Sequence, residues 1–121
     1  RFMLALKVVL AQAAPIPTLI FDEVDAGVGG EAAAAVGAAL AELGRQRQVL
    51  VVTHLAQVAA QADHQVAVRK HERGGRTRSE VRALDADGRV LEVSRMLSGR
   101  PESAAARRHA RELLESAEPG G

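Results

Sequence analysis

Apolar residues along the chain fall into two kinds of stretch, short continuous runs and longer segments with helical spacing. Two runs, residues 19–21 and 49–52, are too short for helices and are typical of strands buried on both faces of a parallel sheet. Between them, residues 31–46 are rich in Ala and carry an apolar stripe, which predicts a helix. Strand, helix and strand in this order predict a parallel βαβ unit with a right-handed crossover.

The remaining elements follow from the same patterns. Residues 1–14 have apolar residues at helical spacing, and Pro15 and Pro17 end that predicted helix. After the second strand we expect a short helix over residues 55–62, a third strand at 66–68, and an edge strand at 77–84 that pairs with it antiparallel. Turns are predicted at residues 74–75 and 87–88, a helix over residues 90–97 that Gly99 ends, and a last helix beyond Pro101.

Acidic residues follow the first apolar run directly. Asp22 and Glu23 are adjacent, and Asp25 comes two residues later. Carboxylates do not lie inside a buried sheet without a partner, but they can lie at its carboxyl edge, where open α/β sheets bind ligands. Asp22 is then placed to hold Mg²⁺ through one oxygen, and Glu23 to orient or deprotonate a water, which is the Walker B layout of a nucleoside-triphosphatase. The alternative is a strand followed by an acidic turn.

A histidine is expected at the same edge of the sheet. The second strand ends in Thr53 and His54, and parallel strands end at the same edge. Strands that are neighbours lie about 4.8 Å apart, so the imidazole of His54 could contact a terminal phosphate of a nucleotide held near Asp22 and Glu23. The alternative is a surface histidine in a turn, and the upstream acids favour the functional interpretation.

Composition narrows the classes of function. The chain has 121 residues, a net charge of +1, no Cys, Trp or Tyr, and two Phe. The lack of Cys excludes disulfides and thiolate metal sites. With two Phe and no Trp or Tyr, stacking of nucleic-acid bases on aromatic rings is nearly excluded as well. Alternating Arg76, Arg78 and Arg82 could contact DNA or a partner, but we expect a solvated edge strand that resists aggregation. Apolar runs are too short for a membrane span, so a cytoplasmic protein is expected.

Two motifs together resemble the C-terminal part of the ATPase head of RecN, a family of bacterial double-strand-break repair proteins related to the structural-maintenance-of-chromosomes (SMC) ATPases. They are residues 19–30, Leu-Ile-Phe-Asp-Glu-Val-Asp-Ala-Gly-Val-Gly-Gly, and residues 51–59, Val-Val-Thr-His-Leu-Ala-Gln-Val-Ala. The Asp-Glu pair and the Thr-His are shared by ATP-binding-cassette ATPases generally. The glycine-rich run and Thr-His-Leu-Ala-Gln-Val resemble RecN in particular and not these ATPases as a whole.

The resemblance implies a fold and a set of roles. The fold would be the C-terminal lobe of a P-loop NTPase of ABC/SMC type, an α/β domain with a mostly parallel sheet flanked by helices and an antiparallel edge hairpin. ATP and Mg²⁺ would be the cofactors. Asp22 would be the magnesium ligand, Glu23 the catalytic base and His54 the switch histidine near the γ-phosphate. Asp25 would open the D-loop, which reaches across a dimer of heads, and Asp25 and Gly27 would bind the cofactor.

The chain departs from the complete family pattern. No Gly-x-x-x-x-Gly-Lys-Ser/Thr phosphate loop is present, and the signature motif would lie just before Arg1. We therefore expect residues 1–118 to be one lobe of a longer protein, with a flexible tail at 119–121, and inactive alone. Its partners would be the N-terminal half of the same head, a second head and DNA, in the bacterial cytoplasm. The alternatives are another cassette or SMC ATPase, such as a transporter subunit, and a non-catalytic DNA- or protein-binding module.

Overall fold

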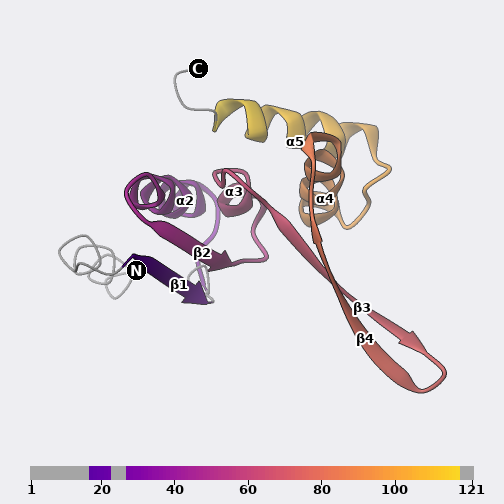
Figure 1. The fold of residues 1–121 in the computed structure, drawn as a ribbon. Coiled ribbons are helices and arrows are strands. Elements are labelled where there is room, and N and C mark those ends of the chain that lie inside the picture. Colours follow the sequence, from indigo (N-terminus) through magenta and orange to yellow (C-terminus); the bar gives the residue numbers. More distant parts are fainter. Residues whose placement is uncertain (1–16, 23–26, 118–121) are drawn as a thin grey trace.

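The computed structural model describes residues 17–22 and 27–117, which form four strands and four helices (Figure 1). The helix expected over residues 1–14 lies outside the described residues. Among the described residues, no helix combines the length and hydropathy that crossing a membrane requires. In chain order the elements are β1 (Thr18–Asp22), α2 (Glu31–Gly44), β2 (Gln48–Val52), α3 (Ala56–Ala59), β3 (Val66–Arg73), β4 (Arg76–Ala83), α4 (Ala86–Ser98) and α5 (Ala104–Ser116).

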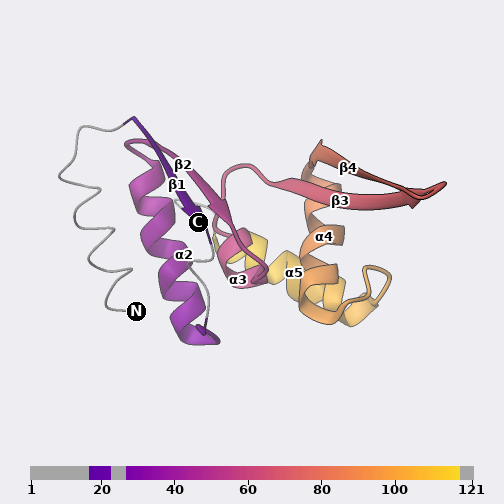
Figure 2. The same ribbon diagram turned by 90° about the horizontal axis from the view of Figure 1, so that it is seen from below.

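The first half of the described chain is the βαβ unit that the sequence predicts. Strands β1 and β2 pair in parallel, with Thr18 opposite Gln48 and Asp22 opposite Val52. Helices α2 and α3 lie on the same side of the two strands (Figures 1 and 2). Their side chains form a core with the strands, of which the buried members are Phe21, Leu40, Leu43 and Val58. The other face of the strands exposes apolar side chains, Ile20, Leu50 and Val52, so the burial on both faces that the sequence predicts is not found among the described residues.

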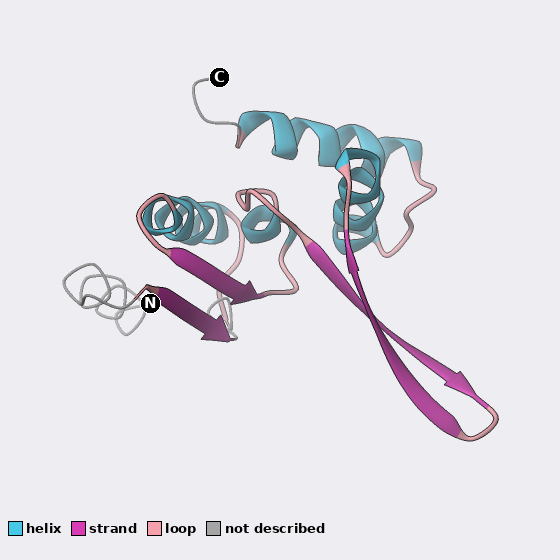
Figure 3. Ribbon diagram, viewed as in Figure 1, coloured by secondary structure: helices cyan, strands magenta, loops and turns pink. Residues whose placement is uncertain are grey.

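The hairpin of β3 and β4 is longer than the sequence pattern indicates and extends away from the other elements (Figure 3). Its turn is Gly74-Gly75, as predicted, and both residues have positive φ, 57° and 75°, as a two-residue type I′ turn requires. In the part of the chain that the structure describes, the hairpin is a sheet of its own and does not pair with β1 or β2. It is therefore a separate antiparallel ribbon beside the parallel pair.

Helices α4 and α5 pack around a second core, in which Ala56, Val93 and Ala110 are buried. The turn predicted at Asp87-Gly88 is wrong, because both residues lie in the first turn of α4. The chain turns earlier, at Asp85, whose side chain caps the helix by accepting a hydrogen bond from the Gly88 N–H at 2.7 Å. The predicted end of this helix at Gly99 is confirmed: Gly99 has a φ of 74°.

Candidate functional site

The carboxyl edge of the parallel pair brings Asp22 and His54 to the same side of the fold. Asp22 is the last residue of β1 and lies opposite Val52, the last residue of β2, and His54 follows Val52 by two residues. Both Asp22 and His54 are exposed. Because β1 and β2 are direct neighbours, their backbones lie about 4.8 Å apart at this edge. The placement expected from the two apolar runs is therefore the one found, whereas Glu23 and Asp25 lie outside the described residues.

Strand alternation sets the face on which Asp22 lies. Phe21 is buried beneath the helices, so Asp22 is on the opposite face, together with the exposed Ile20. Among the described residues, no three His, Cys, Asp or Glu side chains gather into a metal-binding cluster. Asp22 is a carboxylate at the end of a strand, and an ion such as Mg²⁺, which keeps several waters, takes one or two protein carboxylates.

Thr53 fixes how the chain leaves β2. Its hydroxyl oxygen accepts a hydrogen bond from the Leu55 N–H at 3.0 Å, which turns the chain sharply through His54. The chain is then anchored, because Leu55 packs against the first core and Ala56 and Val58 are buried. The sequence pattern indicated no role for Thr53. The signal that could have identified this role is a threonine three residues before the first residue of a helix.

The glycine-rich loop leads into the amino terminus of α2. Gly27 and Gly30 both have positive φ, 72° and 59°, a conformation that glycine adopts at little cost. A Cβ at either position would meet no atom within 4 Å, so backbone conformation and not space requires glycine there. Gly30 is the N-cap of α2 and provides no side-chain hydrogen bond. The first N–H groups of α2 therefore receive no hydrogen bond from a side chain of the N-cap residue, at a helix end that carries partial positive charge.

Curated sequences and a solved structure both resemble this chain. No protein-family model matches the chain. The chain is 57% identical over 117 residues to the DNA repair protein RecN of Streptomyces coelicolor, 56% over 114 residues to that of Deinococcus radiodurans and 44% over 114 residues to that of Vibrio cholerae. These alignments cover 97%, 94% and 94% of this chain, but only 20%, 20% and 21% of the relatives. The chain thus spans about a fifth of the length of the curated relatives it matches.

A solved structure of an SMC ATPase resembles this chain in fold. It comes from work on the ATP-driven dimerization and DNA-stimulated activation of SMC ATPases, and it matches with a TM-score of 0.61 and 26% identity. The match covers 71% of this chain and 51% of the solved chain. The RecN resemblance drawn from the two motifs and the expected α/β fold of an SMC-type ATPase head are therefore both confirmed.

Proposed function

We propose that this chain, which is RecN-like in sequence over 97% of its length and has an SMC-type ATPase fold, supplies one edge of an ATP-hydrolysing head that acts in DNA repair. The observation that carries the proposal is the parallel register of β1 and β2, because it brings Asp22 and His54 to one edge. The relatives are DNA repair proteins, and the solved structure concerns SMC ATPases that dimerize with ATP. We assign the activity to the bacterial cytoplasm, on the nucleoid.

Each site residue has a distinct task in this proposal. Asp22 holds a hydrated Mg²⁺, which, when bound, neutralises charge on the phosphates. Glu23 orients and deprotonates the attacking water. His54 contacts the γ-phosphate, whose developing charge an imidazole N–H can stabilise. Asp25 and Gly27 contact the nucleotide of a second head across the dimer.

The rest of the site must come from other segments. The 121 residues contain no phosphate-binding Gly-Lys-Ser/Thr loop, which in this class cradles the β- and γ-phosphates. We therefore assign residues 1–118 to the C-terminal lobe of a head whose N-terminal half carries that loop. Nucleotide would be bound between two such heads, and hydrolysis would open them. The 121-residue chain by itself should hydrolyse no ATP.

The proposal is tested with Glu23→Gln in a full-length RecN protein that carries this segment. Loss of a positioned base lowers rates by about 10²- to 10⁴-fold, so phosphate release should fall by at least about 100-fold while ATP binding persists. Closed dimers should then accumulate, which sedimentation with ATP would detect. Glu42→Gln is the matched control, because Glu42 is an exposed carboxylate near the far end of α2, paired with Arg45 at 3.3 Å. Normal turnover by Glu23→Gln would leave only a non-catalytic binding role.

His54 is tested separately from the acids. His54→Ala should lower the rate of phosphate release in the same protein, because the substitution removes the imidazole from the carboxyl edge. His64→Ala is the control, since His64 is also an exposed histidine but follows α3 in the chain, whereas His54 precedes it. Equal rates for the two variants would remove His54 from the site.

A further inference from the structure

Positive charge is concentrated on the β3–β4 hairpin. Residues 66–83 hold six Lys or Arg and two Asp or Glu, a net charge of +4. The remaining 103 residues hold ten and thirteen, a net charge of −3. Almost every residue of the hairpin is exposed, Ala67 being the buried exception. A chain that is nearly neutral as a whole therefore carries one basic projection on an acidic body (Figure 1).

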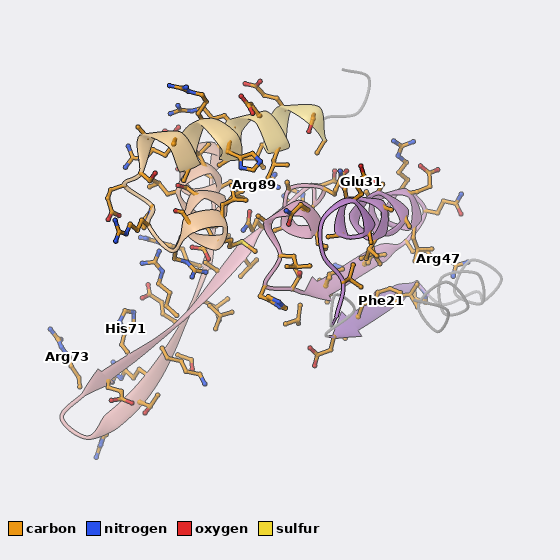
Figure 4. The ribbon with its side chains drawn as sticks, turned by 180° about the vertical axis from the view of Figure 1, so that it is seen from behind. Phe21, Glu31, Arg47, His71, Arg73 and Arg89 are labelled. Atoms are coloured by element: carbon orange, nitrogen blue, oxygen red, sulfur yellow. The ribbon has the colours of Figure 1, made fainter. Side chains whose placement is uncertain are left out.

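The register of the hairpin sorts this charge onto one face. Residues directly opposite in an antiparallel pair share a face, and successive residues alternate between faces. We call one side the arginine face, which comprises Ala67, Arg69, His71, Arg73, Arg76, Arg78, Glu80 and Arg82. Figure 4 shows His71 and Arg73 on the same side of the ribbon. The other face comprises Val66, Val68, Lys70, Glu72, Thr77, Ser79, Val81 and Ala83, and it has no net charge.

Little of this charge is neutralised within the described part of the chain. Arg69 lies 4.0 Å from Glu92 of α4, and His71 lies 3.1 Å from Glu80. Within residues 17–22 and 27–117, no ion pair is made by Arg73, Arg76, Arg78 or Arg82.

Like charges are also placed against one another. Arg73 is the direct cross-strand partner of Arg76, and Arg78 is two residues further along the same face. Such pairs are destabilising, whereas a strand edge that only resists aggregation can alternate its charges. The arrangement therefore suits a polyanion that approaches from outside.

We propose that the arginine face binds the phosphate backbone of duplex DNA. Each strand has eight residues, about 26 Å at 3.3 Å per residue, a length over which duplex DNA carries about 15 phosphates. A two-stranded ribbon fits the major groove, and arginine binds phosphate oxygens through two N–H groups at once. The inference rests on the proposed function only in naming DNA as the polyanion.

The composition of the hairpin selects duplex backbone over other nucleic-acid targets. No Phe, Trp or Tyr lies between residues 66 and 83, and His71 is the one ring there, so the hairpin lacks a row of aromatic side chains on which successive unpaired bases could stack. Arginines alone contribute sequence-independent, salt-sensitive affinity. The hairpin extends away from β1 and β2, so the arginine face belongs to a part of the fold that the two parallel strands do not cover (Figure 1).

The test compares a triple variant, Arg73→Gln with Arg76→Gln and Arg78→Gln, with the unsubstituted full-length RecN protein, without nucleotide. Fluorescence anisotropy of a labelled duplex gives the dissociation constant at several salt concentrations. Each phosphate contact makes the slope of log K against log salt more negative by about 0.9. The triple variant should therefore reduce the magnitude of that slope by about 2.7 and weaken binding at least about tenfold. These side chains are exposed and lie outside both cores, so circular dichroism should show an unchanged fold.

Two controls separate this face from charge in general. Arg100→Gln with Arg108→Gln and Arg111→Gln removes three exposed arginines near and on α5 and should leave the slope unchanged. Lys70→Gln removes one charge from the opposite face of the hairpin, beside Arg78 on the neighbouring rung, and should have less effect than Arg78→Gln. Unchanged affinity and slope in the hairpin triple variant, or an equal loss in the α5 set, would overturn the proposal. The binding assay contains no nucleotide, so its result does not depend on ATP hydrolysis. Failure of the ATPase proposal would appear in the hydrolysis rates of Glu23→Gln and His54→Ala instead.

Discussion

Gly37 is where a single added methyl group should test the packing that positions the candidate site. Gly37 is buried in α2, and a Cβ there would lie 3.1 Å from the Gln57 carbonyl oxygen and 3.2 Å from the Val58 Cα of α3. It would also lie 2.9 Å from the Gln61 Cγ, which belongs to a flexible side chain. The Gln61 side chain can rotate away, but the two backbone atoms can move only with α3.

The expected free-energy change is the sum of two opposing effects. Alanine in a helix interior is favoured over glycine by about 0.5–1 kcal/mol. Overpacking by one carbon costs about 1–3 kcal/mol when neighbours must shift. Gly37→Ala should therefore lower the free energy of unfolding by up to about 2 kcal/mol. Gly44→Ala at the end of α2 meets no atom within 4 Å, so it should be neutral or stabilising by up to about 1 kcal/mol.

Urea unfolding followed by far-UV circular dichroism measures both variants, since the chain has no Trp or Tyr for fluorescence. The difference between Gly37→Ala and Gly44→Ala largely isolates the contact with α3, because both changes carry the same type of gain in helix propensity. Equal stability of the two variants would refute the close approach of α2 and α3. In a full-length protein, Gly37→Ala should also slow hydrolysis, because α3 begins two residues after His54.

Three further substitutions test the second half of the fold by thermal or urea unfolding. Asp85→Ala removes the cap bonded to the Gly88 N–H and should cost about 1 kcal/mol, whereas Asp85→Asn should restore most of it. Val93→Ala should cost about 2 kcal/mol because Val93 is fully buried, and Val68→Ala less than half of that because Val68 is 66% exposed. Arg89→Gln should cost about 1–3 kcal/mol, because the Arg89 guanidinium donates to the carbonyls of Ala59 and Ala62, at 3.2 and 2.9 Å, at the end of α3 and just beyond it. Arg89 is labelled in Figure 4. Burial lowers the pKa of Arg89, and Asp63 opposes that shift. Arginine is effectively always protonated near neutral pH, so the cost should not vary there. A cost near zero for any of the three would contradict the contact named.

The first half of the fold could be predicted because its signals agree. Two continuous apolar runs flank an Ala-rich helix, and such runs are typical of strands in a parallel sheet. The parallel pairing then follows from the right-handed crossover, and the shared edge of Asp22 and His54 follows from the pairing. Sequence alone did not show the hydrogen bond of Thr53, since that depends on where α3 begins.

The second half of the fold was harder to predict from the sequence, because local signals there compete. Asp87-Gly88 is a common turn dipeptide, yet Asp85 caps α4 two residues earlier and the Gly88 N–H supplies the donor. Glycine costs less in the first turn of a helix than in its interior. The polar half of β3 shows no alternation of apolar and polar residues, so the sequence pattern did not reveal its full length. That length is seen only in the pairing of β3 with β4. The sequence pattern therefore showed the arginines of β4 but did not show that Arg69 and Arg73 share their face.

Helix α3 links the two halves, although it has only four residues. Val58 belongs to the first core and Ala56 to the second, and both are buried. Arg89 of α4 holds the carbonyls at the end of α3. The position of His54, just before α3, therefore depends on packing on both sides of this helix. Substitutions in α4 that leave the carboxyl edge untouched should for that reason still change how His54 is presented to a nucleotide.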